Sequence, residues 1–443
     1  MADEYLRKAL YNRRNPQFNI ALNYYCDKDY KSAIPLLLKC RTSNALYLLA
    51  RYNYSKKDYG NMMKYIDLSK NNSYSLCLLA DYYVCIKKDY KLMKKYYLMS
   101  IELGNSNAMY CLGKYYQYTE KDYILMKKYY LMAIELKCSK AMNNLGLYYA
   151  KIEKNYEMMK TYFLMAIELG NSIAMNNLGY YYNGKDYELM QKYYLMAVEM
   201  KCPKAMYNLG KYYTGRDYEL MKKFYLMAIE MKCPKSMCRL GKYYQYIEKD
   251  YELMKYYYLM AIDLKSVYSM NILGLYYQYN EINYELMKYY YLMAIDLKYV
   301  YSMHNLAYYY QFIEKDYELM KKYYLMAIDL KCIHSIRNLG CYYYKMNYTG
   351  LAAKYLTMAL EHGNISVIDK LAKILPKSRL IQLNVPMSKF SNLDQYKYFG
   401  VGAIADECGI CLTNGDLILM PRCTHRTCSE CYIQLKVCPY CRA

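Results

Sequence analysis

A short motif of the form x-Leu-Gly-x-Tyr-Tyr recurs along most of this chain and limits the folds that the chain can adopt. Its small residue stands 31 or 33 residues after the previous one in the clearer copies. These residues are Gly113, Gly146, Gly179, Gly210, Gly241, Gly274, Ala307 and Gly340, with Ala21, Ala50 and Ala80 in weaker copies. This period is typical of helix–turn–helix repeats, which stack into a solenoid. The sequence therefore predicts an all-α solenoid of about eleven units over residues 1–375.

A second marker, an Asp or Asn followed by Tyr, runs in register with the first. It stands at Asp29, Asp58, Asp89, Asp122, Asn155, Asp186, Asp217, Asp250, Asn283, Asp316 and Asn347. A short acceptor side chain before an apolar periodic run is an N-cap, because it satisfies free amides of the first helical turn. Each unit is therefore predicted to hold a first helix, such as 140–152, and a second helix, such as 155–169. Pro203 and Pro234 fit the first turn of a first helix.

The side chains of the repeats are expected to serve packing. The glycine of the first helix and an alanine of the second are expected to let the two helices approach closely; these alanines are Ala133, Ala166, Ala228 and Ala261. Most of the 70 Tyr and 33 Met are interpreted as core residues. Cys138, Cys202, Cys233 and Cys332 are expected to be free thiols, and His304, His334 and His362 have no ligand spacing. We find no catalytic motif in the repeats.

The net charge of +22 invites a nucleic-acid interpretation. The lysines, however, recur in every repeat and form no single cluster, so we interpret them as solvated helix faces and do not expect specific nucleic-acid binding. RNA binding by the basic repeats stays a second alternative. No secretory signal and no apolar run of membrane-spanning length is visible, so a cytoplasmic, reducing location without a membrane partner is predicted.

The repeats resemble Sel1-like repeats, relatives of tetratricopeptide repeats. The likeness rests on Ala-Met-Asn-Asn-Leu-Gly-x-Tyr-Tyr, on the Asp-Tyr that opens the second helix, and on Tyr-Tyr-Leu-Met-Ala-Ile-Glu-Leu at its end. It covers most of residues 20–375. Membership would imply a protein-interaction scaffold and leaves the partner open.

The repeat pattern ends after Leu375, and 376–407 is interpreted as a cap and linker. From Cys408 the pattern is C-x2-C, eleven residues, C-x-H-x2-C-x2-C, six residues, C-x2-C. The predicted ligands are Cys408, Cys411, Cys423, His425, Cys428, Cys431, Cys438 and Cys441. Thiolate and imidazole suit Zn²⁺, and eight ligands fill two tetrahedral sites. We therefore predict a small zinc-stabilised domain with two Zn²⁺ at 408–443; the spacing alone allows sequential or cross-braced pairing.

This pattern resembles the C3HC4 RING finger, and the resemblance implies cross-braced pairing. Cys408, Cys411, Cys428 and Cys431 would hold the first zinc, and Cys423, His425, Cys438 and Cys441 the second. By the same resemblance Ile410, Leu435 and Pro439 would contact a ubiquitin-conjugating enzyme. Leu435 stands where many active members have Trp. Arg442 corresponds to the arginine that bonds both ubiquitin and the conjugating enzyme, and its planar fork suits two acceptors.

The resemblance thus implies a RING-type E3 ubiquitin ligase that works without a covalent intermediate. The repeats would recruit a protein substrate, and the finger would bind a ubiquitin-conjugating enzyme charged with ubiquitin. The main alternative is a non-enzymatic adaptor whose finger mediates protein binding. Repeat proteins with a RING finger and this composition resemble predicted proteins of giant DNA viruses of amoebae, which would place the targets in an infected host cell.

Overall fold

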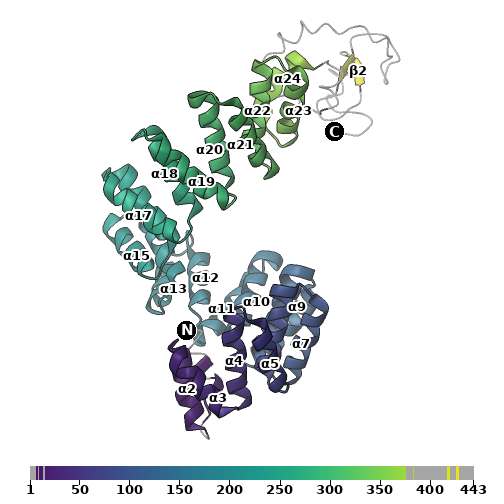
Figure 1. The fold of residues 1–443 in the computed structure, drawn as a ribbon, viewed down its shortest axis with the longest axis vertical. Helices are drawn as coiled ribbons and strands as arrows, with labels where there is room; N and C mark the ends of the chain where they lie inside the picture. Colours follow the sequence, from purple (N-terminus) through teal and green to yellow (C-terminus); the bar gives the residue numbers. More distant parts are fainter. Residues whose placement is uncertain are drawn as a thin grey trace. The chain divides into compact units, whose positions relative to one another are not determined.

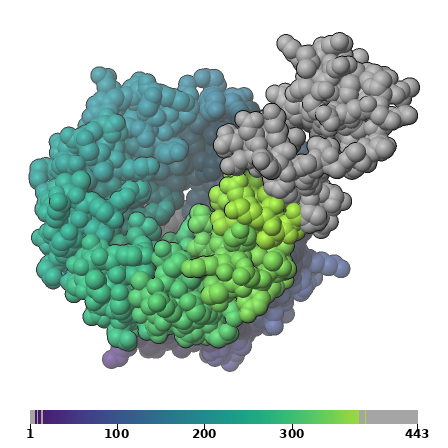
Figure 2. Space-filling view, turned by 90° about the horizontal axis from the view of Figure 1, so that it is seen from above, coloured from purple at the N-terminus to yellow at the C-terminus, as the bar shows by residue number. Residues whose placement is uncertain are grey.

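We analysed a computed structural model of the chain. The structure describes residues 6–7, 9–12, 15–375, 383, 417–419 and 426–428. It divides into two compact units, Met1–Met260 (unit 1) and Ala261–Ala443 (unit 2), with the boundary inside helix α17. Within each unit, successive helices follow one another in chain order (Figure 1). In the space-filling view the described residues of unit 2 form a continuous green surface, ordered by residue number (Figure 2).

Between residues 15 and 375 the chain forms helix pairs, which confirms the predicted all-helical repeat solenoid. The first helices are α2 (Pro16–Cys26), α4 (Ser43–Ser55), α6 (Ser73–Tyr82), α8 (Ser106–Tyr115), α10 (Ser139–Tyr148), α12 (Ser172–Tyr182), α14 (Pro203–Tyr213), α16 (Pro234–Tyr243), α18 (Val267–Tyr279), α20 (Val300–Tyr309) and α22 (Ile333–Lys345). The second helices are α3 (Tyr30–Cys40), α5 (Tyr59–Leu68), α7 (Tyr90–Glu102), α9 (Tyr123–Glu135), α11 (Tyr156–Glu168), α13 (Tyr187–Glu199), α15 (Tyr218–Glu230), α17 (Tyr251–Asp263), α19 (Tyr284–Asp296), α21 (Tyr317–Asp329) and α23 (Thr349–Glu361). The 3₁₀ turn η6 (Ile365–Val367) and helix α24 (Ile368–Ile374) follow the last pair.

The predicted N-caps of the second helices are confirmed at ten of the eleven positions. Asp122, for example, accepts a hydrogen bond from the backbone amide of Leu125 at 2.9 Å, and Asp250 accepts one from Leu253 at 2.9 Å. Asn347 is the exception: its φ is +61°, and Tyr348 precedes α23 without a side-chain cap bond. The prediction for Asn347 was wrong because this residue forms the left-handed turn one position before the cap.

Several first helices end in a π-helical turn, which the sequence interpretation missed. These turns are η1 (Tyr83–Lys87), η2 (Tyr116–Glu120), η3 (Tyr149–Glu153), η4 (Tyr244–Glu248) and η5 (Tyr310–Glu314). Each is followed by a lysine with positive φ and then by the N-cap of the second helix. In α12 and α14, whose connections are two residues shorter, Gly184 and Gly215 take positive φ and an ordinary turn closes the loop. In these five pairs the two extra residues are accommodated by widening the last helical turn, whereas the α18–α19 connection has the same length and closes without a π-helical turn.

The predicted close approach of helices within a pair is present. A Cβ added to Gly113 would lie 2.6 Å from the ring of Tyr130, and one added to Gly210 would lie 2.6 Å from the ring of Tyr225. In these two pairs the first-helix glycine therefore faces a fully buried tyrosine of the second helix, a contact that the sequence interpretation did not identify. Ala133 is buried as well, three residues beyond Tyr130. The ring fills the space that glycine leaves, which large side chains on both helices would not allow.

A repeated contact joins each of several pairs to the next. In η2, Glu120 accepts hydrogen bonds from the hydroxyl of Tyr115 at 2.9 Å and from Lys94 of the preceding second helix. The Lys94 ammonium also lies 5.3 Å from the ring centroid of Tyr115 and 5.5 Å from that of Tyr116. The same Lys–Glu–Tyr contact recurs at Lys127–Glu153–Tyr148 and Lys288–Glu314–Tyr309. We call this group the lysine clasp; it ties the π-helical turn to the preceding pair.

The strands are short. β1 (Leu417–Leu419) pairs antiparallel with β2 (Arg426–Cys428), with Leu417 opposite Cys428 and Leu419 opposite Arg426. Residues 420–425 connect the two strands.

Candidate functional site

The exposed side of the first helices is the surface on which the repeats differ most. In α14, Lys204 and Lys211 are exposed and Asn208 is half-buried; the three fall at i, i+4 and i+7 on one face. On the opposite face Met206 and Leu209 are buried in the core. The exposed face is therefore distinct from the packed face, and core packing does not determine which residues it carries.

In unit 1 this surface is basic. The exposed positions of α8, α10, α14 and α16 carry Lys114, Lys140, Lys204, Lys211, Lys235, Arg239 and Lys242. The sequences of these four helices and of α12 contain no Asp or Glu. Of these five successive first helices, four therefore carry exposed positive charge without an acidic residue, and α12 carries no charged residue.

Hydrogen bonds between asparagines hold these first helices side by side. The Asn177 amide of α12 donates to Asn143 of α10 at 2.8 Å, and the Asn208 amide of α14 donates to Asn176 of α12 at 2.9 Å. Asn143 and Asn176 are buried, so these bonds satisfy polar groups that would otherwise be costly to bury. The Asn-Asn pairs of the repeat motif thus have a structural role between neighbouring repeats, which sequence reasoning did not assign.

In unit 2 the same surface is mainly aromatic. Tyr268, Tyr301, Tyr308 and Phe312 are 41%, 53%, 38% and 51% exposed. The rings of Tyr308 and Phe312 contact each other, with centroids 4.5 Å apart. The asparagine bond persists here, from Asn305 to Asn271 at 3.0 Å. Unit 2 therefore keeps the connection between first helices and changes what they expose.

His304 is the histidine of α20. Its Nδ1 lies 3.0 Å from the Ser335 hydroxyl, and its ring centroid lies 6.0 Å from that of His334. Burial, with smaller contributions from His334 and Arg337, lowers the pKa of His304 to about 4. The imidazole is therefore neutral at pH 7. Within the described residues no group of three or more His, Cys, Asp or Glu side chains could hold a metal ion.

The cysteines of the helix pairs are free thiols, as predicted for Cys138, Cys202, Cys233 and Cys332. These four precede first helices at the cap position without a side-chain cap bond. Burial raises the pKa of the Cys138 thiol, so this thiol is a weak nucleophile at neutral pH.

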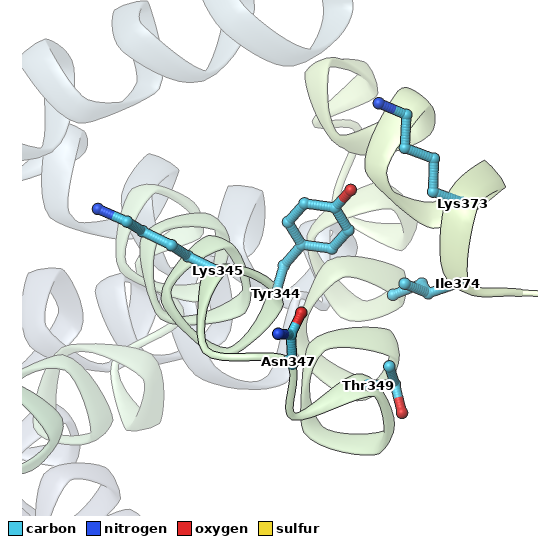
Figure 3. Close-up of a pocket in the computed structure, with 6 residues that line it drawn as sticks. All are labelled: Tyr344, Lys345, Asn347, Thr349, Lys373 and Ile374. Atoms are coloured by element: carbon cyan, nitrogen blue, oxygen red, sulfur yellow. The ribbon is translucent and has the colours of Figure 1, made fainter.

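A hollow of about 390 Å³ lies where the α22–α23 turn meets α24 (Figure 3). Its lining consists of Tyr344, Lys345, Asn347, Thr349, Lys373 and Ile374. The two lysines make it basic, and the lining has no acid or thiol. Because it offers no acid–base pair or nucleophile, we assign no chemistry to it.

The predicted zinc finger lies largely outside the described residues. This holds for the predicted ligands Cys408, Cys411, Cys423, His425, Cys431, Cys438 and Cys441 and for Ile410, Leu435, Pro439 and Arg442. Cys428 is the last residue of β2, and Cys423 and His425 belong to the segment that connects the strands. The two zinc sites and the conjugating-enzyme contacts therefore stay predictions from sequence.

In the described part of the chain, no helix combines the length and apolarity needed to cross a membrane. No family model matches the sequence, and a search of curated proteins finds no match.

Solved structures similar to this chain include Sel1 repeat proteins. A protective antigen of uropathogenic Escherichia coli with an SLR fold is 19% identical with a TM-score of 0.44; the likeness covers 86% of this chain and 92% of that one. A Sel1 repeat protein from Oxalobacter formigenes is 22% identical with a TM-score of 0.40, over 49% of this chain and 96% of that one. The human IFIT1 dimer with PPP-AAAA is 14% identical with a TM-score of 0.40, over 81% and 93%.

Proposed function

We propose that this chain is a RING-type E3 ubiquitin ligase whose helix pairs bind the protein to be ubiquitinated. The observation that carries the proposal is the set of eight metal-ligand residues between Cys408 and Cys441, with His425 fourth in order. Seven thiolates and one imidazole in four close pairs fit two tetrahedral Zn²⁺ ions, and this donor set is a poor match for harder ions. The antiparallel pairing of β1 with β2 adds a short hairpin inside the same segment.

The zinc ions would hold this segment in one fold and take no part in the transfer. Cys408, Cys411, Cys428 and Cys431 would bind one ion, and Cys423, His425, Cys438 and Cys441 the other. Ile410, Leu435 and Pro439 would offer an apolar surface to the conjugating enzyme. Arg442 would donate hydrogen bonds to ubiquitin and to the conjugating enzyme together, which restrains the donor ubiquitin in a reactive position.

The stack of helix pairs would contribute by holding the substrate near the charged conjugating enzyme. A bound substrate has a high effective concentration for a transfer that the finger promotes, even when its own affinity for the enzyme is low. No catalytic group of the described helices is required, since the substrate lysine attacks the thioester directly.

An autoubiquitination assay with a panel of conjugating enzymes tests the proposal. Wild type is expected to form ubiquitin ladders, and Arg442→Ala and Cys408→Ser are expected to abolish them. Cys138→Ser, which removes a thiol of the helix pairs, is the matched control and is expected to leave the ladders unchanged.

The Arg442→Ala protein should still bind two zinc ions per chain, which separates lost catalysis from lost folding. Absence of ladders with every conjugating enzyme, from protein that holds two zinc ions, would reject ligase activity in favour of the adaptor alternative.

A further inference from the structure

Two cysteines of neighbouring first helices lie beside each other in unit 1. Cys77 of α6 is buried, with 4% of its surface exposed, and Cys111 of α8 is half-buried. The side-chain amide nitrogen of Asn107 lies 3.4 Å from the sulfur of Cys77 and 3.8 Å from that of Cys111. One amide group therefore contacts both sulfur atoms, and we call the two cysteines the thiol pair.

The register of the repeats explains why these two side chains meet. Where asparagines join neighbouring first helices, the first stands three residues before the small residue of its motif, and the second stands two residues before that of the next motif. Asn143 of α10 and Asn177 of α12 occupy these places and bond at 2.8 Å. Cys77 and Cys111 occupy the same places in α6 and α8, and both pairs are 34 residues apart in the sequence. The thiol pair therefore stands where an asparagine pair joins other repeats.

The surroundings of the thiol pair keep it uncharged while it is reduced. The adjacent Cys111 thiol, burial and the negative charge of Asp81 raise the pKa of the Cys77 thiol well above its ordinary value. Asp81 is itself half-buried and accepts a hydrogen bond from the Tyr97 hydroxyl at 2.5 Å. A persistent thiolate is costly at such a place, whereas a disulfide carries no charge and suits it.

We propose that the thiol pair is a redox-sensitive link, in which peroxide joins Cys77 to Cys111 by a disulfide bond. Of the free cysteines in the described residues, these two are the pair that stands in the register of the asparagine bonds. The bond would connect the pair α6–α7 covalently to the pair α8–α9, where other repeats have a hydrogen bond that breaks and reforms. The inference goes beyond the proposed ligase function, because the link needs neither zinc nor a conjugating enzyme.

One molecule of hydrogen peroxide oxidises one thiol pair. Cys111, the more accessible of the two, loses its proton and attacks a peroxide oxygen; the O–O bond breaks, and a sulfenic acid and water form. Cys77 then loses its proton and attacks the sulfur of Cys111, so that the S–S bond forms, the S–O bond breaks and a second water leaves. The two sulfur atoms lose two electrons, which the peroxide gains. A dithiol reductant reverses the reaction by exchange.

Cys138 is the thiol that competes with Cys77 for Cys111. It precedes α10, and the charge of Cys111 contributes to its raised pKa. Within the described helix pairs, however, the Asn107 amide contacts Cys77 and Cys111 but not Cys138. The geometry therefore favours Cys77 as the partner.

Peptide mapping of the full chain tests the proposal. Wild type is treated with hydrogen peroxide, its remaining thiols are alkylated, and it is cleaved with trypsin without reduction. The disulfide should join peptide 71–87 to peptide 96–114, with Cys85 alkylated, and dithiothreitol should separate them. Cys77→Ser and Cys111→Ser should each abolish the linked product. Cys85→Ser, which removes an exposed thiol of the same peptide, is the matched control and should retain it.

Thermal unfolding followed by circular dichroism measures the effect of the link. Peroxide should raise the unfolding midpoint of wild type by at least about 5 °C, because the bond restricts the unfolded chain. The variant Cys77→Asn/Cys111→Asn restores an asparagine pair, so it should keep the fold and shift by less than about 1 °C. A link from Cys111 to Cys138, no linked product at a peroxide concentration that oxidises Cys85, or equal shifts in wild type and the double variant would each overturn the proposal.

Discussion

In unit 1 the exposed face of the first helices carries lysine and asparagine together with the exposed Tyr118, Tyr180 and Tyr246, whereas the same face of α18 and α20 in unit 2 carries tyrosine, phenylalanine and histidine and no lysine or arginine. The buried face is alike in both: Leu209 and Met206 of α14 correspond to Leu306 and Met303 of α20, and all four are buried. Each unit also has glycine against a buried tyrosine and the lysine clasp. The repeat framework thus determines the buried positions, and the exposed positions are free to carry a different chemistry in each unit.

The largest expected effect concerns what the two units share. Tyr225→Ala in unit 1 and Tyr291→Ala in unit 2 each remove a ring that covers a glycine, at Gly210 and Gly274. Each should lower the stability of the folded chain by about 3–5 kcal/mol, because a large cavity forms beside a residue without a side chain. Urea unfolding followed by circular dichroism measures it. A loss below about 1 kcal/mol in one unit would show that the two frameworks are not equivalent.

The second-largest expected effect is a pH dependence of stability caused by His304 of unit 2. The pKa of His304 is lowered to about 4, whereas an unfolded histidine titrates near 6.5, so the unfolded chain takes up the proton first as pH falls. Stability is therefore full above about pH 6.5 and declines by about 3 kcal/mol toward pH 4 through this residue alone. His304→Asn should flatten the pH dependence of urea unfolding between these values, and His362→Asn, at an exposed residue, should not. If the free energy of unfolding changed equally with pH in wild type and in His304→Asn, His304 would not be the source of the pH dependence.

The smallest effect separates the two kinds of lysine in unit 1. Lys127→Gln removes a clasp ion pair and cation–π contacts at 5.2 and 5.4 Å, so it should cost about 1 kcal/mol. Lys140→Gln, at an exposed position of α10, should change stability by less than about 0.5 kcal/mol. Thermal unfolding at low and high salt checks both, since salt should reduce the Lys127 effect. A larger loss for Lys140→Gln than for Lys127→Gln would mean that the exposed lysines of the first helices contribute more to stability than the lysine clasp does.

The repeat period and the Asp-Tyr marker were enough to predict the helix pairs and most of their caps. Both signals act within a few residues along the chain, as at Asp122 and Leu125. The failure at Asn347 shows the limit of the marker, since a left-handed turn and a cap favour the same residue types.

The sequence predicted the contacts between helices less well than it predicted the helices themselves. The small residues of the two helices, such as Gly113 and Ala133, predicted their close approach, but the sequence did not show that the ring of Tyr130 fills the space beside the glycine. The asparagine bonds join residues 32–34 positions apart, for example Asn143 and Asn177, and no local pattern indicates them. A spacing of 33 in place of 31 accompanies the π-helical turns but does not determine them, because the unit of α18 has a spacing of 33 and no such turn. The zinc finger rests on ligand spacing alone and stays a prediction.

The contacts between repeats have a consequence for how the chain is synthesised. The clasp joins residues 26 positions apart, as in Lys94 and Glu120, and the asparagine bonds span little more than one repeat. Each pair therefore acquires its partners as soon as the following pair has left the ribosome, so folding can proceed in the direction of translation. Under this order the repeats would be assembled before the cysteine-rich end of the chain is made.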